Sequence, residues 1–200
     1  MRRRNAIRQL VIASNNPKKR QEIAAMLAQH GIAVVSIEET RSIEVVEDGD
    51  SFAVNASKKA SAFAEVNQLP ALADDSGLCV AALNGAPGIY SSRYAGVDGD
   101  DAANNHKLLQ ALAGERNRAA WFCCHMHLAF PDGRAPHIAE GRVDGHILSN
   151  HDGVNGFGYD PLFFCPELDV SFACATPAQK ARVSHRGRAL RALANQLHAA

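Results

Sequence analysis

The sequence predicts an α/β fold with a mixed central β-sheet and flanking helices. Short apolar runs suited to strands alternate with amphipathic stretches suited to helices along most of the 200 residues, an order typical of α/β proteins. Two long runs, 119–130 and 136–148, are joined by the turn PDGR, which predicts an antiparallel hairpin within the sheet. Several helices also carry a polar cap before the first turn or a glycine after the last. The length suits one domain.

Each element follows from local pattern. The run RQLVIAS predicts a first strand, and the helix after it has Asn15 or Asn16 as its cap, Pro17 in its first turn and Gly31 at its end. A second strand is expected at IAVVSI. The stretch PALADDSGLCVAAL predicts strand, turn and strand, and the Gly-rich and aromatic segment 150–166 predicts loops. The remaining predicted helices cover residues 50–68, 101–114 and 186–199.

Composition limits the class of protein. Lys plus Arg and Asp plus Glu number 21 each, so no net field attracts a nucleic-acid backbone. No apolar run approaches the roughly 18 residues of a membrane span, and the basic start MRRRNAIR lacks the apolar core of a signal peptide. The odd number of cysteines, all among apolar neighbours, favours buried reduced thiols. We therefore expect a cytoplasmic protein that binds neither nucleic acid nor membrane. The cysteines are Cys79, Cys123, Cys124, Cys165 and Cys174.

Two adjacent carboxylates, Asp74 and Asp75, interrupt an apolar stretch. Burying a carboxylate costs several kcal/mol unless it is paired, hydrogen-bonded or bound to a metal. One interpretation is a tight turn, for which Asp-Asp-Ser-Gly is suitable chemistry. The other is a metal site presented by that turn. These residues alone leave both open.

Two lysines stand on apolar faces of predicted helices. At about 100° per residue, Lys59 falls in the middle of the stripe that carries Phe52 and Phe63, whereas Lys58 points away. Lys59 either snorkels to solvent or approaches an anion. Lys19 lies on the core side of the first helix, at the end where a cation opposes the helix dipole. An anion bound at the free backbone N–H groups of the loop SNNPKK would remove the unfavourable interaction of Lys19 with the helix dipole.

Together the lysines favour a polyphosphate site, although the loop lacks the glycines of a P-loop. Phosphates on lysines commonly require a divalent metal with oxygen ligands, which gives Asp74 and Asp75 a role. Glu47, in EVVEDGDSF, is a further acid just before the helix that bears Lys59. A solvated acidic loop remains the alternative for this segment.

The last third contains further candidate residues. Phe157 and Tyr159 either stack a nucleobase or fill a core, and Asp160 either caps a turn or contacts ligand. Ser184 is a candidate helix cap, while His185 and Arg186 are donors suited to a 6-oxo purine. Elsewhere, His125 and His127 share one face of a strand, which permits metal binding, but the sequence offers no third ligand.

Six short motifs, taken in their order along the chain, make the sequence similar to a known protein family. They are ASNNPKKRQEI, EDGDSFAVNASKKA, ADDSGL, GAPGIYSSRYAG, GFGYDPLF and SHRGRAL. From about Val11 to Leu193 the chain resembles the inosine triphosphate pyrophosphatase family, which hydrolyses dITP, ITP and XTP to monophosphate and diphosphate. The resemblance implies an elongated two-lobed single domain over residues 1–200 with a cleft between the lobes, a basic extension at residues 1–7, a homodimer, Mg²⁺ as cofactor, and a purine nucleoside triphosphate as partner.

The resemblance also assigns roles. It implies that Asp75 is catalytic, that Glu47 and Asp75 bind the metal, and that Asp74 supports them. One departure is TPAQK before Lys180, where the family often has acidic residues. The residues implied to bind substrate are Ser14, Asn15, Asn16, Pro17, Lys18, Lys19, Lys59, Ser76, Phe157, Gly158, Tyr159, Asp160, Lys180, His185 and Arg186.

The implied mechanism has Asp75 deliver water to the α-phosphorus while the lysines stabilise the diphosphate leaving group. Two alternatives belong to other classes. A nucleotide-sensing module would bind without hydrolysis, and a nucleoside triphosphate phosphatase would release orthophosphate. The products of the reaction distinguish all three.

Overall fold

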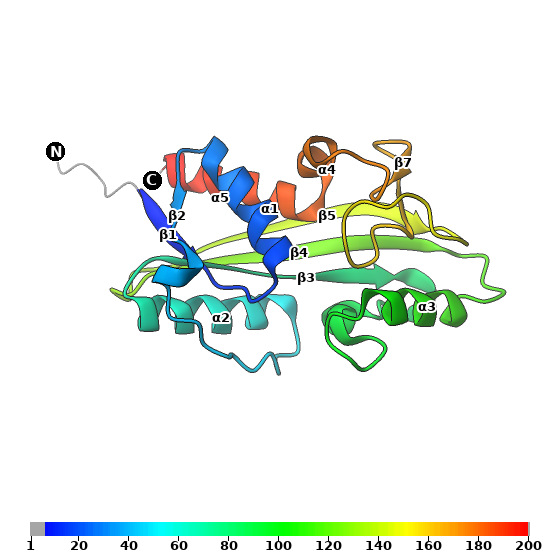
Figure 1. Cartoon of the computed structure of the whole chain (residues 1–200), viewed down its shortest axis with the longest axis horizontal. Helices are drawn as coiled ribbons and strands as arrows, with labels where there is room; N and C mark the ends of the chain where they lie inside the picture. Colours follow the sequence, from blue (N-terminus) through cyan, green and yellow to red (C-terminus); the bar gives the residue numbers. More distant parts are fainter. Residues whose placement is uncertain (1–6, 200) are drawn as a thin grey trace. The chain divides into compact units, whose positions relative to one another are not determined.

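The computed structural model describes residues 7–199, and its centre is a seven-stranded mixed sheet with the order β2-β1-β3-β4-β5-β6-β7 (Figure 1). Strand β1 is parallel to β2 and β3, whereas β6 is antiparallel to both β5 and β7. The predicted mixed α/β fold is therefore confirmed. The strands are β1 (Gln9–Ile12), β2 (Ala33–Val34), β3 (Ala71–Val80), β4 (Ala119–Ala129), β5 (His137–Ile147), β6 (Phe163–Cys165) and β7 (Val170–Ser171).

The helices begin and end largely where the sequence marks them. Asn16 caps the first, with Pro17 in its first turn, and Ser51 caps the second. Ser184 accepts a hydrogen bond from the N–H of Gly187 and so caps the last helix, as predicted. The helices are α1 (Pro17–Gln29), α2 (Phe52–Asn67), α3 (Asp101–Ala111), α4 (Pro177–Val183) and α5 (His185–Ala199), with short 3₁₀ turns at Ile37–Glu39, Ala81–Leu83 and Gly88–Arg93.

The chain divides into two compact units. Unit 1 contains residues 7–75, 124–141 and 188–199, and unit 2 contains residues 76–123 and 142–187. In unit 1, α1 and α5 cover one face of the sheet and α2 covers the other (Figure 1). Strands β3, β4 and β5 each contribute residues to both units. The predicted N-terminal extension, residues 1–7, falls outside the described residues except for its last position.

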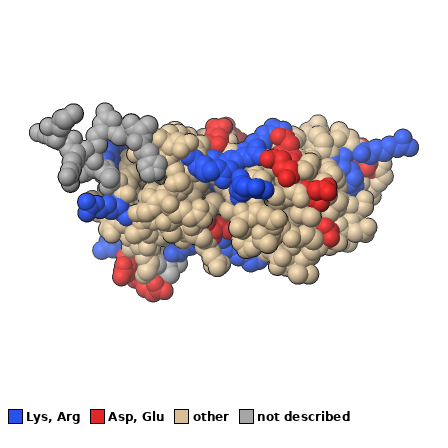
Figure 2. All heavy atoms as spheres, turned by 90° about the horizontal axis from the view of Figure 1, so that it is seen from above, with Lys and Arg blue, Asp and Glu red and all other residues tan. Residues whose placement is uncertain are grey.

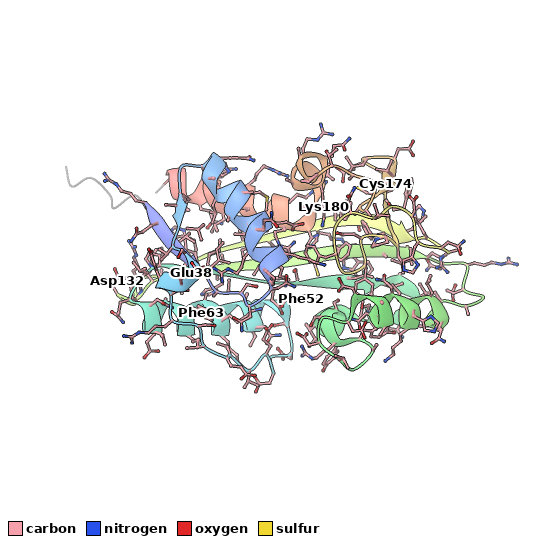
Figure 3. The ribbon with its side chains drawn as sticks, viewed as in Figure 1. Glu38, Phe52, Phe63, Asp132, Cys174 and Lys180 are labelled. Carbon is pink, nitrogen blue, oxygen red and sulfur yellow. The ribbon has the colours of Figure 1, made fainter. Side chains whose placement is uncertain are left out.

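Each unit has its own apolar core. In unit 1, Phe63 of α2, labelled in Figure 3, packs with small residues of β1 and β3 that include Val11 and Ala73. In unit 2, Phe163 of β6 lies within a larger cluster, with its ring centroid 4.8 Å from that of Phe122 and 5.0 Å from that of Phe172. The small side chains in unit 1 allow α2 to approach the sheet closely.

Four predictions about local structure are wrong. Strand β3 runs without a turn through Asp74 and Asp75, because lysines from two helices pair with both carboxylates, as described below. The predicted loop 150–166 contains β6, and α4 was not predicted, although Thr176 and Gln179 form a capping box at its start. The five cysteines are free thiols, but Cys174, labelled in Figure 3, is exposed in the turn after β7.

The surface carries both signs of charge. On the face seen in Figure 2, acidic and basic side chains are interspersed and form no extended region of one sign. None of the helices in the described part of the chain has the length and apolar character needed to cross a membrane.

The core of unit 2 gives a stability prediction. Phe163→Ala removes a fully buried ring from the aromatic cluster, and we expect it to lower the free energy of unfolding by about 3–5 kcal/mol. Val154→Ala, at a side chain that is 96% exposed, is the control and should change it by less than about 0.5 kcal/mol. Urea denaturation measures both, and equal effects of the two variants would contradict the assigned core.

Candidate functional site

The two adjacent aspartates lie on opposite faces of β3, as successive residues of a strand must. Asp74 Oδ2 lies 3.6 Å from Lys19 Nζ of α1, and Asp75 Oδ1 lies 3.5 Å from Lys59 Nζ of α2. The side chain of Asp74 is fully buried and that of Asp75 is 10% exposed. A strand in the middle of the sheet therefore holds two buried carboxylates because each faces a helix that supplies a cation.

Lys59 is shared between two carboxylates. Its Nζ donates to Glu47 Oε2 at 2.8 Å and also lies beside Asp75. Its side chain is only 10% exposed, so it approaches an anion and does not snorkel. Lys58 points to the outside and pairs with Asp48. The helical-face prediction for both lysines is confirmed, and Glu47 contacts the buried Lys59 and does not lie in a fully solvated loop.

Asn55 of α2 was not predicted to belong to this group. Its Nδ2 donates to Asp75 Oδ2 at 3.2 Å, and its Oδ1 accepts from the backbone N–H of Gly49 at 2.9 Å. The residue is 1% exposed. A polar side chain beside Ala56 on the apolar face of the helix was the available signal, since buried polar groups need partners.

The electrostatics of the group follow from burial and mutual contact. Burial raises the pKa of the Asp75 carboxyl above its ordinary value, and this outweighs the opposing effect of Lys59 and Lys19. Burial disfavours the charged form of Lys59, yet the surrounding carboxylates, Asp75 first among them, raise the pKa of its ammonium. Asp75 is thus a carboxylate with increased basicity, and Lys59 remains a cation.

Glu47 and Asp75 fit a magnesium ion. Both carboxylates contact one ammonium group, so they lie close enough to share a cation. Mg²⁺ is commonly held by one or two carboxylates together with substrate phosphates and not by an all-protein cage. Among residues 7–199, no group of three His, Cys, Asp or Glu side chains is placed so that it could hold a metal ion.

The loop before α1 differs from its predicted form. Asn16 Oδ1 accepts from the N–H groups of Lys18 and Lys19, and the Asn16 carbonyl accepts from Arg20 N. The first-turn N–H groups that we expected to meet an anion are therefore already hydrogen-bonded. Ser14 Oγ accepts from Asn16 N at 3.2 Å, and Asn15 accepts from Ser42 at 3.4 Å.

The aromatic loop of unit 2 is organised around Asp160, which is 3% exposed. Its Oδ2 accepts from the N–H of Phe157 at 2.9 Å and from Lys180 Nζ at 2.6 Å. Lys180, labelled in Figure 3, also lies 4.7 Å from the centroid of the Phe157 ring. A Cβ at Gly156 would lie 2.1 Å from the same Oδ2, and the φ of +79° also requires glycine. Asp160 thus caps the turn, one of its two predicted roles.

The next residues of the loop are held by unit 2. Gly158 N donates to Asp101 Oδ2, and Gly158 O accepts from Asn105 Nδ2, both at 2.8 Å. Tyr159 is buried in the core, and its hydroxyl donates to the Ser91 carbonyl at 2.9 Å. The core interpretation therefore holds for Tyr159. Asp101 and Asn105 were missed because their contacts join distant parts of the sequence.

Arg186 and His185 lie at the start of α5 and are almost completely buried. Arg186 Nη2 donates to Ser76 Oγ at 3.0 Å, and its guanidinium lies 5.8 Å from the centroid of Phe157. His185 stacks on Phe122, with the ring centroids 4.8 Å apart. Unit 2 therefore connects the predicted residues Ser76, Phe157, Lys180 and Arg186, while His185 packs on Phe122.

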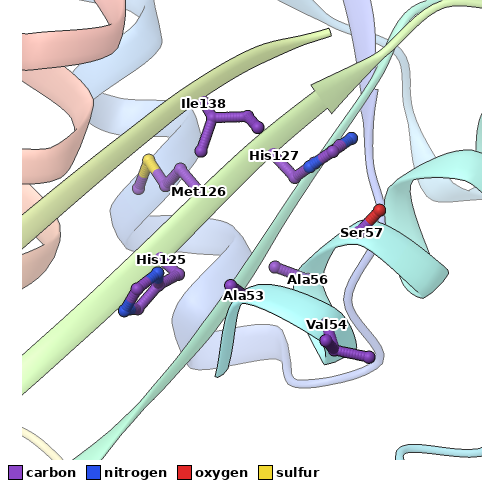
Figure 4. A pocket seen from close by; sticks show the side chains of 8 residues that line it. All are labelled: Ala53, Val54, Ala56, Ser57, His125, Met126, His127 and Ile138. Carbon is purple, nitrogen blue, oxygen red and sulfur yellow. The ribbon is translucent and has the colours of Figure 1, made fainter. Parts of the chain in front are cut away.

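His125 and His127 face a small apolar pocket of about 210 Å³ in unit 1 (Figure 4). It lies beside α2, with Ser57 among its lining residues. His125 Nδ1 lies 3.1 Å from Glu140, and burial lowers the pKa of His127. Within residues 7–199, no group of three or more His, Cys, Asp or Glu side chains that could hold a metal ion includes these two histidines.

Asp75 gives a prediction of pH dependence. Because burial favours its neutral form, its carboxyl should bind a proton at a pH above the ordinary aspartate pKa of about 3.9. Carbon-detected NMR of the metal-free protein measures this midpoint, and Asp75→Asn assigns the signal. Asp48 is the control, because its hydrogen bond with Lys58 lowers its pKa. A midpoint for Asp75 at or below that of Asp48 would refute the described environment.

Comparison with known proteins places the chain in a family. The model of the Ham1 family matches residues 10–196. The dITP/XTP pyrophosphatase of Syntrophobacter fumaroxidans is 54% identical over 90% of this chain and 78% of its own length, and that of Desulforamulus reducens is 51% identical over 91% and 92%. A solved HAM1 protein from Coxiella burnetii superposes with a TM-score of 0.86 at 40% identity, over 96% of this chain and 99% of that one. The chain belongs to the Ham1 family.

Proposed function

We propose that this protein hydrolyses dITP, ITP and XTP to the nucleoside monophosphate and diphosphate, and so removes deaminated purine nucleotides from the nucleotide pool. The observation that carries the proposal is the convergence of Glu47 and Asp75 on the buried ammonium of Lys59. This group combines metal ligands, a basic carboxylate and a phosphate-binding cation. The similarity to proteins named dITP/XTP pyrophosphatase supports the same reaction.

The reaction class implies Mg²⁺, which Glu47 and Asp75 would hold together with the triphosphate. When bound, the ion would polarise the phosphoryl group and offset its negative charge. Asp74 supports this arrangement by fixing Lys19 on the other face of β3. The all-oxygen donor set and the single shared cation are the features of the chain that fit this ion.

Asp75 acts as the general base in this proposal. Its increased basicity suits it to take a proton from the water that attacks the α-phosphorus. Lys19 and Lys59, now paired with carboxylates, would turn toward the phosphates, and Lys180 is assigned to the same task. Ser14, Asn16 and the adjoining side chains of the loop complete the set that binds phosphate.

The base of the nucleotide is assigned to residues of unit 2. Phe157 offers an aromatic face for stacking, while His185 and Arg186 are donors for the 6-oxo group. Adenine carries a 6-amino group at that position, so it would leave these buried donors unpaired. This difference supports selection of inosine and xanthosine nucleotides over ATP. We further propose a cytoplasmic homodimer whose partner is the small nucleotide and not a nucleic acid.

Product analysis tests the reaction directly. With Mg²⁺ and ITP we expect IMP and diphosphate in phosphorus NMR spectra, while ATP stays nearly unchanged and chelation of the metal stops the reaction. Orthophosphate would indicate a phosphatase and overturn the assignment of the lysines. Tight binding of ITP without any product would instead identify a nucleotide-sensing protein.

Asp75→Asn tests the role of the base. The amide keeps the size of the side chain but cannot accept the proton, so kcat should fall about 10²- to 10⁴-fold while ITP binding persists. Steady-state assays of diphosphate release measure kcat, and calorimetric titration with ITP measures the binding affinity. Asp48→Asn is the matched control at an exposed carboxylate and should retain full turnover. Near-normal turnover of Asp75→Asn would remove this residue from the mechanism.

A further inference from the structure

Asn55 joins the two acidic residues assigned to the metal. Its amide group donates to Asp75 Oδ2 at 3.2 Å, while its carbonyl oxygen accepts from Gly49 N at 2.9 Å. Gly49 lies two residues after Glu47 in the same segment. One buried side chain on α2 therefore contacts both the strand that carries one carboxylate and the segment that carries the other.

The contact with Asp75 orients the carboxylate. The Asn55 amide is bound to Oδ2, whereas Oδ1 is the oxygen nearest Lys59 Nζ, at 3.5 Å. Glu47 Oε2 meets the same Nζ at 2.8 Å. The amide thus directs Oδ1 of Asp75 toward the cation that Glu47 also contacts. An aspartate or a leucine at position 55 would lack this donor.

The contact with Gly49 is equally restrictive. A Cβ at position 49 would lie 2.6 Å from Asn55 Oδ1 and 2.7 Å from Val54 Cγ1. A side chain at position 49 would therefore force Asn55 Oδ1 and Val54 Cγ1 to move and would disturb the hydrogen bond. The close packing at Gly49, which donates this hydrogen bond, shows that the segment bearing Glu47 lies directly against Asn55.

We propose that Asn55, with Gly49, is the positioning residue that sets the placement of Glu47 relative to Asp75 and thereby the affinity of the protein for a divalent cation. The inference rests on the metal-dependent reaction proposed above. Asn55 does not itself contact the reacting atoms; it acts through the two carboxylates. Partners of metal ligands commonly contribute 10- to 100-fold to metal affinity.

The test uses the full-length protein without nucleotide and Mn²⁺ as a spectroscopic probe. Electron paramagnetic resonance of free Mn²⁺ gives the dissociation constant, and the Mg²⁺ concentration for half-maximal ITP turnover is a second readout. We expect Asn55→Ala to weaken Mn²⁺ binding about 10- to 100-fold. Gly49→Ala should weaken it in the same direction, because it displaces the segment while leaving the Asn55 side chain intact.

Asn67 provides a matched control on the same helix. It also holds a backbone segment, with its Oδ1 accepting from Arg41 N at 2.7 Å and its Nδ2 donating to Arg41 O at 3.2 Å. Neither of those bonds involves a carboxylate. Asn67→Ala should therefore lower the midpoint of thermal unfolding but keep Mn²⁺ affinity within about threefold of the parent, below the range for partners of metal ligands.

Several outcomes would overturn the inference. They are unchanged Mn²⁺ affinity in Asn55→Ala and Gly49→Ala, an equal loss in Asn67→Ala, or no Mn²⁺ binding by the parent protein. Because Mn²⁺ binding is measured without nucleotide, it is independent of the products formed. If the parent protein binds Mn²⁺ but releases no diphosphate, and the Asn55→Ala and Gly49→Ala variants bind Mn²⁺ more weakly, the proposed function is contradicted while the role of Asn55 is supported.

Discussion

The site depends on charge compensation across one strand. β3 places Asp74 and Asp75 on opposite faces of the sheet, and each face receives a lysine from a different helix. An isolated buried carboxylate would cost several kcal/mol and would drive the strand toward solvent. Pairing offsets part of that penalty, although burial still dominates at Asp75, and it ties α1 and α2 to the sheet. The same ion pairs therefore link the packing of unit 1 to the chemistry proposed for it.

In the proposed function, the charges of this group have a further meaning. Within these contacts, three carboxylates, Glu47, Asp74 and Asp75, meet two ammonium groups, Lys19 and Lys59. An excess of carboxylates at these contacts would favour a divalent cation, and the bound cation would in turn favour a triphosphate.

The sequence predicts those parts of this site that depend on local periodicity. The helical period places Lys59 inside and Lys58 outside, and the cap and proline mark the start of α1 at Asn16. It does not predict that β3 continues through Asp75, because Asp-Asp-Ser-Gly has the local chemistry of a turn and only tertiary ion pairs override it. Asn55 is missed for a related reason, since Asp75 lies 20 residues away in the chain. Contacts between distant segments decide these cases.

The buried aspartates Asp160 and Asp75 have similar partners but differ in the lengths of their contacts. Asp160 receives the Lys180 ammonium and the Phe157 N–H on one oxygen at 2.6 and 2.9 Å. Asp75 also has a lysine and an N–H donor, but they meet different oxygens at 3.5 and 3.2 Å. Short contacts hold the first carboxylate as a structural element of its loop. In the proposed function, the longer contacts would allow Asp75 to exchange a lysine for a metal ion or a water proton without breaking a strong bond. The difference in length fits the capping role of Asp160 and the catalytic role proposed for Asp75.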